Sequence, residues 1–237
     1  MDSRSVSKWS AAVGLIAAPI LYAAAFAVQP AWADDGAAYL AEVAAAQTRH
    51  ALWPVLFALG SVALLAGMLG VARLSRGPRG WLAQAGSLVV GVASAVIGGV
   101  VVAISAAELA MVAGGDRAQM VALYDRTDEV GLAMAVFGVL WGGGFLLGTV
   151  VLAAGLLLRR VVPLWSPLLL VAWLVALSVF QSPLGSVLSC LVLLAALLPL
   201  AYRVATLSDE QWARWQPLPG PVRAEASPAG EIRTDPV

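Results

Sequence analysis

The chain has few of the residues that form redox and metal sites. Its 237 residues include one cysteine, Cys190, and one histidine, His50. One cysteine cannot close an intrachain disulfide or supply the paired thiolates of a structural zinc site. One histidine cannot supply both axial ligands of a bis-histidine haem. The sequence therefore excludes disulfide frameworks, thiolate zinc sites and this class of haem, and we expect no cofactor.

Charged residues are also scarce. They make up 12% of the chain, and 14 basic residues balance 14 acidic ones without any run of lysine and arginine. A nucleic-acid groove or a polybasic lipid clamp needs such a run, so we expect neither. Apolar residues make up 61% of the chain and mean hydropathy is +0.87, whereas the apolar share of soluble domains is about half. The composition predicts a membrane protein whose surroundings are a lipid bilayer.

Apolar runs divide the chain into six candidate spans. About 20 apolar residues in a helix cross the hydrocarbon core of a bilayer. The runs occupy residues 10–28, 51–72, 82–113, 130–158, 167–180 and 184–202. They predict an all-α fold, namely a polytopic bundle of six transmembrane helices.

The first span has a second interpretation. Ala31, Trp32 and Ala33 form a small-x-small sequence of the kind that signal peptidase cleaves. However, the apolar run before it is longer than the 7 to 15 residues of a signal core, and Trp32 also suits an interfacial anchor. We expect the span to be retained.

The distribution of basic residues predicts the orientation. With six spans, residues 1–9, 73–81, 159–166 and the tail from residue 203 share one side of the membrane and hold eleven of the 14 basic residues. Lysine and arginine accumulate on the cytoplasmic side, so both termini are expected there. The dominance of arginine over lysine, with abundant alanine, valine, glycine and leucine, is typical of a GC-rich bacterial genome. We therefore expect a bacterial plasma-membrane protein, with residues 204–237 as a largely disordered cytoplasmic tail.

Two longer connections, residues 29–50 and 114–129, then face outward. A short helix is expected over residues 35–47, capped by Asp35 or the aspartate before it, and another within the second connection. A third short helix is expected near residues 208–215. The outward loops are acidic, but their spacing does not match a calcium-binding hand, so no metal site is expected.

The third span carries small side chains at every fourth position from Ala83 to Ala107. Such a row lets a neighbouring helix backbone approach closely within a bilayer. The fourth span contains three consecutive glycines, which permit a close crossing or a kink. We expect these two spans to pack through Ser87, Gly91, Ala95, Gly99, Gly142, Gly143 and Gly144.

Two ionisable residues are candidates for a ligand or proton site. Glu108 is an acidic residue in an otherwise apolar run, which makes it a functional candidate by default. His50 begins the second span and can titrate near neutral pH. A structural interpretation stays open for both residues. Glu108 would then be a hydrated carboxylate at the outer boundary of the membrane, and His50 a solvated residue at the entrance of its helix. Together with Trp53 and Trp141, they would line a pocket that opens outward between spans two, three and four.

Three classes of function are compatible with these features. The first is interaction or scaffolding, with a membrane-protein partner or a second copy of the chain, and it predicts a filled bundle. The second is transport or binding of a small solute or lipid, which requires Glu108 and His50 to meet at one concave site. The third is an enzyme that uses these two residues as acid and base. The sequence has no G-x-S-x-G or H-E-x-x-H motif, so we assign no catalytic residue.

The order of features along the chain adds one further expectation. The features follow a fixed order. The first span ends near Gln29 and is followed by an outer helix. The second span starts with His50 to Trp53 and ends with Arg73, and the third span ends with Glu108. This order resembles a family of uncharacterised six-span integral membrane proteins common in actinobacteria, over about residues 8–203. The resemblance implies a retained first span and a compact six-helix bundle, and it implies no activity or cofactor.

Overall fold

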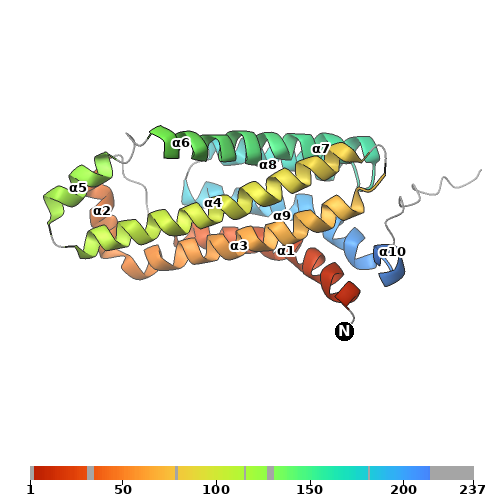
Figure 1. Ribbon diagram of the computed structural model, residues 1–237, viewed down its shortest axis with the longest axis horizontal. Coiled ribbons are helices and arrows are strands. Elements are labelled where there is room, and N and C mark those ends of the chain that lie inside the picture. Colours follow the sequence, from red (N-terminus) through yellow and green to blue (C-terminus); the bar gives the residue numbers. More distant parts are fainter. Residues whose placement is uncertain are drawn as a thin grey trace, which may run out of the picture.

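The computed structural model describes residues 3–30, 35–77, 80–114, 116–126, 131–180 and 182–213. All regular elements in these ranges are helices, so the predicted all-α class is confirmed (Figure 1). Two predictions lie outside the described residues, namely the cleavage sequence at Ala31 to Ala33 and the disordered tail beyond residue 213.

Five helical segments in the described ranges are long and apolar enough to cross a bilayer, which makes the chain a multi-pass membrane protein. They are α1 (Ser3–Val28), α3 (Gln47–Leu74), α4 (Trp81–Ala113), the continuous run of α6 (Gly131–Gly138), η2 (Val139–Leu147) and α7 (Gly148–Arg159), and α9 (Pro183–Thr206). The remaining predicted span, the fifth at residues 167–180, corresponds to α8 (Trp165–Val179). With 15 residues, α8 is about 22 Å long and therefore shorter than a hydrocarbon core of about 30 Å.

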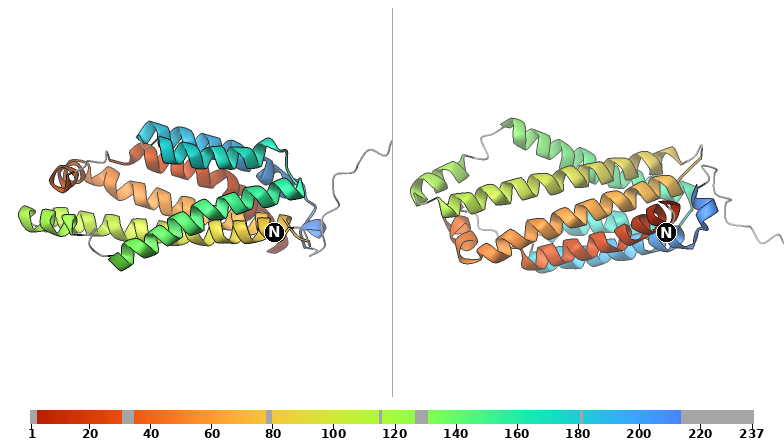
Figure 2. Two further views of the ribbon diagram at one scale, coloured as in Figure 1. Left: turned by 90° about the horizontal axis from the view of Figure 1, so that it is seen from above. Right: turned by 60° about the horizontal axis from the view of Figure 1, so that its bottom comes forward.

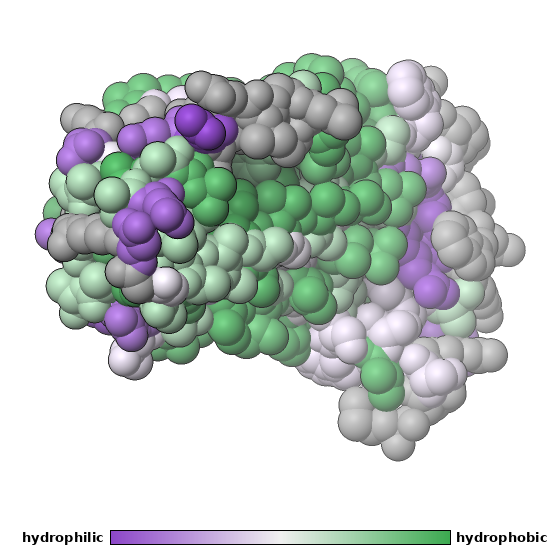
Figure 3. Space-filling view, turned by 60° about the vertical axis from the view of Figure 1, so that its left-hand side comes forward, coloured by the Kyte–Doolittle hydropathy of each residue, from purple (hydrophilic) through white to green (hydrophobic). Residues whose placement is uncertain are grey.

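The apolar helices pack in a closed ring. α1 lies against α3 and α9, α3 against α4, α4 against η2 and α7, and α8 against α7 and α9 (Figure 2). Buried leucines from four of these helices form the core: Leu15, Leu64, Leu152 and Leu197. Many other large apolar side chains are exposed, and Figure 3 shows them as a hydrophobic band with hydrophilic residues at its two ends. This distribution fits a surface in contact with lipid.

Two short helices cover one end of the ring (Figure 1). Asp35 accepts a hydrogen bond from the backbone N–H of Ala38, 3.1 Å away, at the start of α2 (Gly36–Ala45). Asp116 caps α5 (Arg117–Asp125) in the same way. The two predicted short helices and the cap at Asp35 are confirmed. The cap forms because an aspartate before a helix accepts from otherwise unpaired N–H groups of the first turn.

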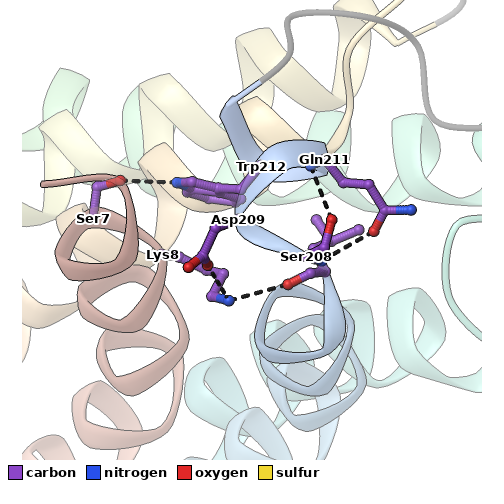
Figure 4. A network of polar contacts seen from close by, with 7 residues as sticks. Ser7, Lys8, Ser208, Asp209, Gln211 and Trp212 are labelled. Atoms are coloured by element: carbon purple, nitrogen blue, oxygen red, sulfur yellow. Dashed lines mark hydrogen bonds and ion pairs between the residues drawn. The ribbon is translucent and has the colours of Figure 1, made fainter. Parts of the chain in front are cut away.

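The first and last described helices meet at the opposite end of the ring (Figure 4). Lys8 Nζ of α1 lies 2.6 Å from Asp209 Oδ1 of α10 (Asp209–Ala213), and Trp212 Nε1 donates a 2.8 Å hydrogen bond to Ser7 Oγ. Arg73 at the end of α3 donates to the backbone carbonyl of Trp212. The predicted helix near residues 208–215 is confirmed for its described part, and it ties α1 to the end of α9.

The closest approach between α4 and α7 is made by Gly86 and Gly155. A Cβ atom at Gly155 would collide with the backbone nitrogen of Ala83, and one at Gly86 with that of Leu152. Neither glycine belongs to the predicted packing set.

The predicted contact of the row on α4 with the fourth span is therefore wrong at Gly91 and at Gly99. Gly91 packs against α3, and Gly99 is exposed with no atom within 4 Å of a Cβ placed on it. Ser87 is buried and Ala95 half-buried. Because a helix turns once in 3.6 residues, a spacing of four drifts by about 40° at each step. The row thus faces α7 at Ala83, α3 at Gly91 and the surface at Gly99.

The glycine trio lies in η2, a π-helical segment. Positions Gly142 and Gly143 have open space where a Cβ would lie, so the close packing expected there is wrong. Gly144 does contact α4, at Ala93. The trio thus marks an irregular helical turn with one glycine contact, and such turns often occur at functional sites.

Candidate functional site

Three polar side chains from three helices meet beneath α2. His50 Nε2 in the first turn of α3 lies 2.8 Å from Glu108 Oε2 near the end of α4. Tyr39 Oη on α2 donates a hydrogen bond of 3.3 Å to the same Glu108 oxygen. The two atoms are close enough for an ion pair. However, an N–H bond on Nε2 would not point at the Glu108 oxygen, so the contact does not have the geometry of a hydrogen bond. We call these three residues the carboxylate cluster.

The carboxylate cluster is shielded from its surroundings. The His50 side chain is 0% exposed and that of Glu108 9%, so neither is the solvated boundary residue that the structural interpretation assumed. A lone buried carboxylate costs several kcal/mol, so Glu108 needs a proton or a cation beside it. His50 Nδ1 and Trp53 Nε1 are buried without a hydrogen-bond partner in the described chain.

Tyr39 holds its proton firmly. Burial, reinforced by the Glu108 carboxylate and by the neighbouring Tyr124, raises the pKa of the Tyr39 phenol above its ordinary value near 10. Tyr39 is stacked on Tyr124 of α5, with ring centroids 5.2 Å apart, and makes an edge contact with His50. It is therefore a fixed hydrogen-bond donor to Glu108.

A cavity of about 230 Å³ extends from Glu108 into the bundle. Its walls come from α1, α2, α3, α4, α6 and η2, and most of them are aromatic or aliphatic. Trp53, Trp141 and Glu108 all line it, whereas His50 reaches it only through its contact with Glu108. The other lining residues are Phe26, Gln29, Tyr39, Phe57, Ile97, Val101, Ile104 and Phe137.

The inner end of the cavity is closed by stacked rings. Trp141 is stacked on Phe145, at 5.3 Å between centroids, and also faces Phe137. A second void of about 20 Å³ lies beyond Trp141 and beside Tyr22. The Tyr22 hydroxyl is hydrogen bonded to two serines of α3 and α4, so it presents no unpaired group to this void. The cavity is thus polar at the Glu108 end and apolar at the other.

Sequence reasoning found four residues of this region but missed Tyr39. The signal was present, because the cap at Asp35 fixes the register of α2 and places Tyr39 on its buried face with Leu40 and Val43. A hydroxyl on such a face needs a buried partner.

Among the described residues, no three His, Cys, Asp or Glu side chains are grouped to hold a metal ion. Comparison of the chain with protein-family models, curated proteins and solved structures found no match. Function is therefore inferred from the carboxylate cluster and its cavity.

Proposed function

We propose that this chain is a bacterial plasma-membrane protein of six crossings, of the six-span type it resembles, that binds a small and largely apolar molecule beneath α2. The observation that carries the proposal is the cavity of about 230 Å³ with a buried carboxylate at one end. Scaffolding requires only a filled bundle and gives no reason for either feature.

The size of the cavity limits the ligand. Pockets for drug-sized molecules measure about 300–1,000 Å³, and an apolar cavity of about 150 Å³ holds benzene. A volume of about 230 Å³ therefore suits one small aromatic or branched molecule. Ile104 on the wall is 49% exposed. The wall of the cavity therefore reaches the surface of the bundle beside α4.

Binding is favoured over acid–base catalysis by the position of His50. A catalytic acid and base must both reach the reacting atoms, directly or through one water. His50 is fully buried and does not line the cavity. His50 instead lies behind Glu108, with Nε2 2.8 Å from Oε2, and helps to orient that carboxyl group.

A small apolar photoreactive probe, 3-trifluoromethyl-3-phenyldiazirine, tests the proposal. Irradiation of the full-length protein in lipid nanodiscs is expected to label Trp53 and Trp141, which lie on the cavity wall. Val101→Trp fills the cavity from α4 and is expected to reduce these adducts about tenfold, because the loss of cavity volume excludes the probe. Adducts are located and counted by peptide mass spectrometry.

Val102→Trp is the matched control, since Val102 is 38% exposed and does not line the cavity. It is expected to leave the labelling of Trp53 and Trp141 unchanged. Adducts on exposed residues provide an internal standard for probe in the lipid. Equal labelling of the cavity wall in both variants would contradict ligand binding at this site.

Six crossings and cytoplasmic termini are supported by the charges at the α10 end, where Lys8, Arg73, Arg76 and Arg159 gather. In a Cys190→Ser background, Leu184→Cys at the start of α9 is expected to react with an impermeant maleimide added to intact cells. Glu210→Cys on α10 is expected to react only after permeabilisation. Reaction of Leu184→Cys only from the inside would mean that α8 does not cross and would overturn the six-span topology.

A further inference from the structure

We infer that the ligand of this cavity is an organic cation, an amine or quaternary ammonium group carried on an apolar body. Its charge lies against Glu108 and its body lies among the aromatic rings. The inference rests on the proposed function, because it identifies the chemical class of the bound molecule.

One oxygen of the Glu108 carboxylate is left for such a ligand. His50 and Tyr39 both contact Oε2. No hydrogen bond or ion pair joins Oε1 to the described chain, and Glu108 is part of the cavity wall. A carboxylate oxygen at the end of an apolar cavity accepts well from an N–H donor or attracts a quaternary ammonium group.

The ionisable groups along the wall favour one sign of charge. Glu108 is the acidic side chain of the lining, and the described lining residues include no lysine or arginine. His50 lies behind Glu108 and contacts Oε2, the oxygen that also accepts from Tyr39. His50 does not line the cavity. An anionic ligand would therefore meet a carboxylate without a cation of the wall to offset it, and this repulsion gives selectivity against anions.

The rest of the wall suits the same charge. Six of the lining residues are aromatic: Phe26, Tyr39, Trp53, Phe57, Phe137 and Trp141. The face of an aromatic ring attracts a cation, tryptophan most strongly, and the attraction increases when water is excluded. Rings on α1, α3 and η2 surround the space below Glu108, so they can enclose an alkylammonium group that is too large to be held by hydrogen bonds alone.

A metal ion is a poorer occupant. Calcium takes six to eight oxygen ligands and magnesium about six, whereas the wall offers one carboxylate, the side chain of Gln29 and a phenol. A neutral molecule would leave the carboxylate without additional charge compensation when it displaces water from the cavity. An organic cation meets both the aromatic and the acidic part of the wall.

Calorimetric titration with two molecules of one shape tests the inference. Benzyltrimethylammonium carries a quaternary nitrogen where neopentylbenzene has a carbon. Each molecule is titrated into the full-length protein in nanodiscs. The heat of its partition into empty nanodiscs is subtracted. The cation is expected to bind about tenfold or more tightly than the hydrocarbon. Glu108→Gln is expected to remove most of this difference and to leave the affinity for neopentylbenzene within about twofold.

Glu42→Gln is the matched control, because Glu42 is an exposed carboxylate of α2 that does not line the cavity. It is expected to bind both molecules as the unsubstituted protein does. Equal affinities for the two molecules in the unsubstituted protein would overturn the cation assignment and leave ligand binding in place. Failure of both molecules to bind would overturn both proposals.

Discussion

Gly155→Ala is expected to lower the free energy of unfolding by about 3 kcal/mol, the upper end of the range for overpacking a tight interior. The added methyl group would meet the backbone of Ala83, which cannot rotate away as a side chain can. The helices α4 and α7 would have to separate along the whole contact that Gly86 and Gly155 create. Reversible unfolding in mixed detergent micelles, followed by circular dichroism, measures the change.

Gly143→Ala provides the matched control on the same continuous helical segment. A Cβ at Gly143 meets no described atom within 4 Å, and alanine favours helix over glycine by about 1 kcal/mol. We expect unchanged or slightly increased stability. If both substitutions changed stability equally, the α4–α7 contact would not depend on the absence of a side chain at Gly155.

His50→Leu is expected to cost about 3–5 kcal/mol of unfolding free energy, because it leaves the buried Glu108 without the neighbouring imidazole that can share its proton. Glu108→Leu is expected to cost less, because a lone imidazole can become neutral. The double variant is expected to recover a large part of the loss, since it removes the uncompensated charge together with its partner. A double-mutant cycle in the same unfolding assay measures the coupling.

Tyr39→Phe is the control for general disturbance of the carboxylate cluster. It removes a single hydrogen bond of 3.3 Å, so a loss of about 1 kcal/mol is expected. Additive effects of His50→Leu and Glu108→Leu would show that the two side chains do not stabilise one another.

The apolar helices, the two short helices and the cap at Asp35 could be predicted from the sequence because each depends on neighbours along the chain. An apolar run forms a helix in lipid because its backbone groups must bond to one another. Asp35 and Asp116 cap α2 and α5 through residues two or three positions away. The length of α8 shows the limit, since an apolar run of 15 residues does not by itself determine a crossing.

The helix contacts could not be predicted from spacing alone. A row of small residues shows where the backbone of a neighbouring helix can approach. Because the row turns by about 40° around α4 at each step, successive positions face different neighbours. The same limit applied to the carboxylate cluster. The sequence offered Glu108 and His50 as members of one pocket but could not show that they meet. The position of α2 over the ends of α3 and α4 brings Tyr39 against both residues and excludes solvent.

The contact between α1 and α10 has a consequence for the order in which the protein is made. Lys8 and its carbonyl partner at Leu207 are separated by 199 positions, so the ribosome produces α1 long before the residues that hold it. During that interval α1 can dock on α3, its early neighbour in the chain, but its other face waits for α9. Ring closure is therefore the last assembly step, and premature termination before α9, which begins at Pro183, would release chains with α1 held on one side.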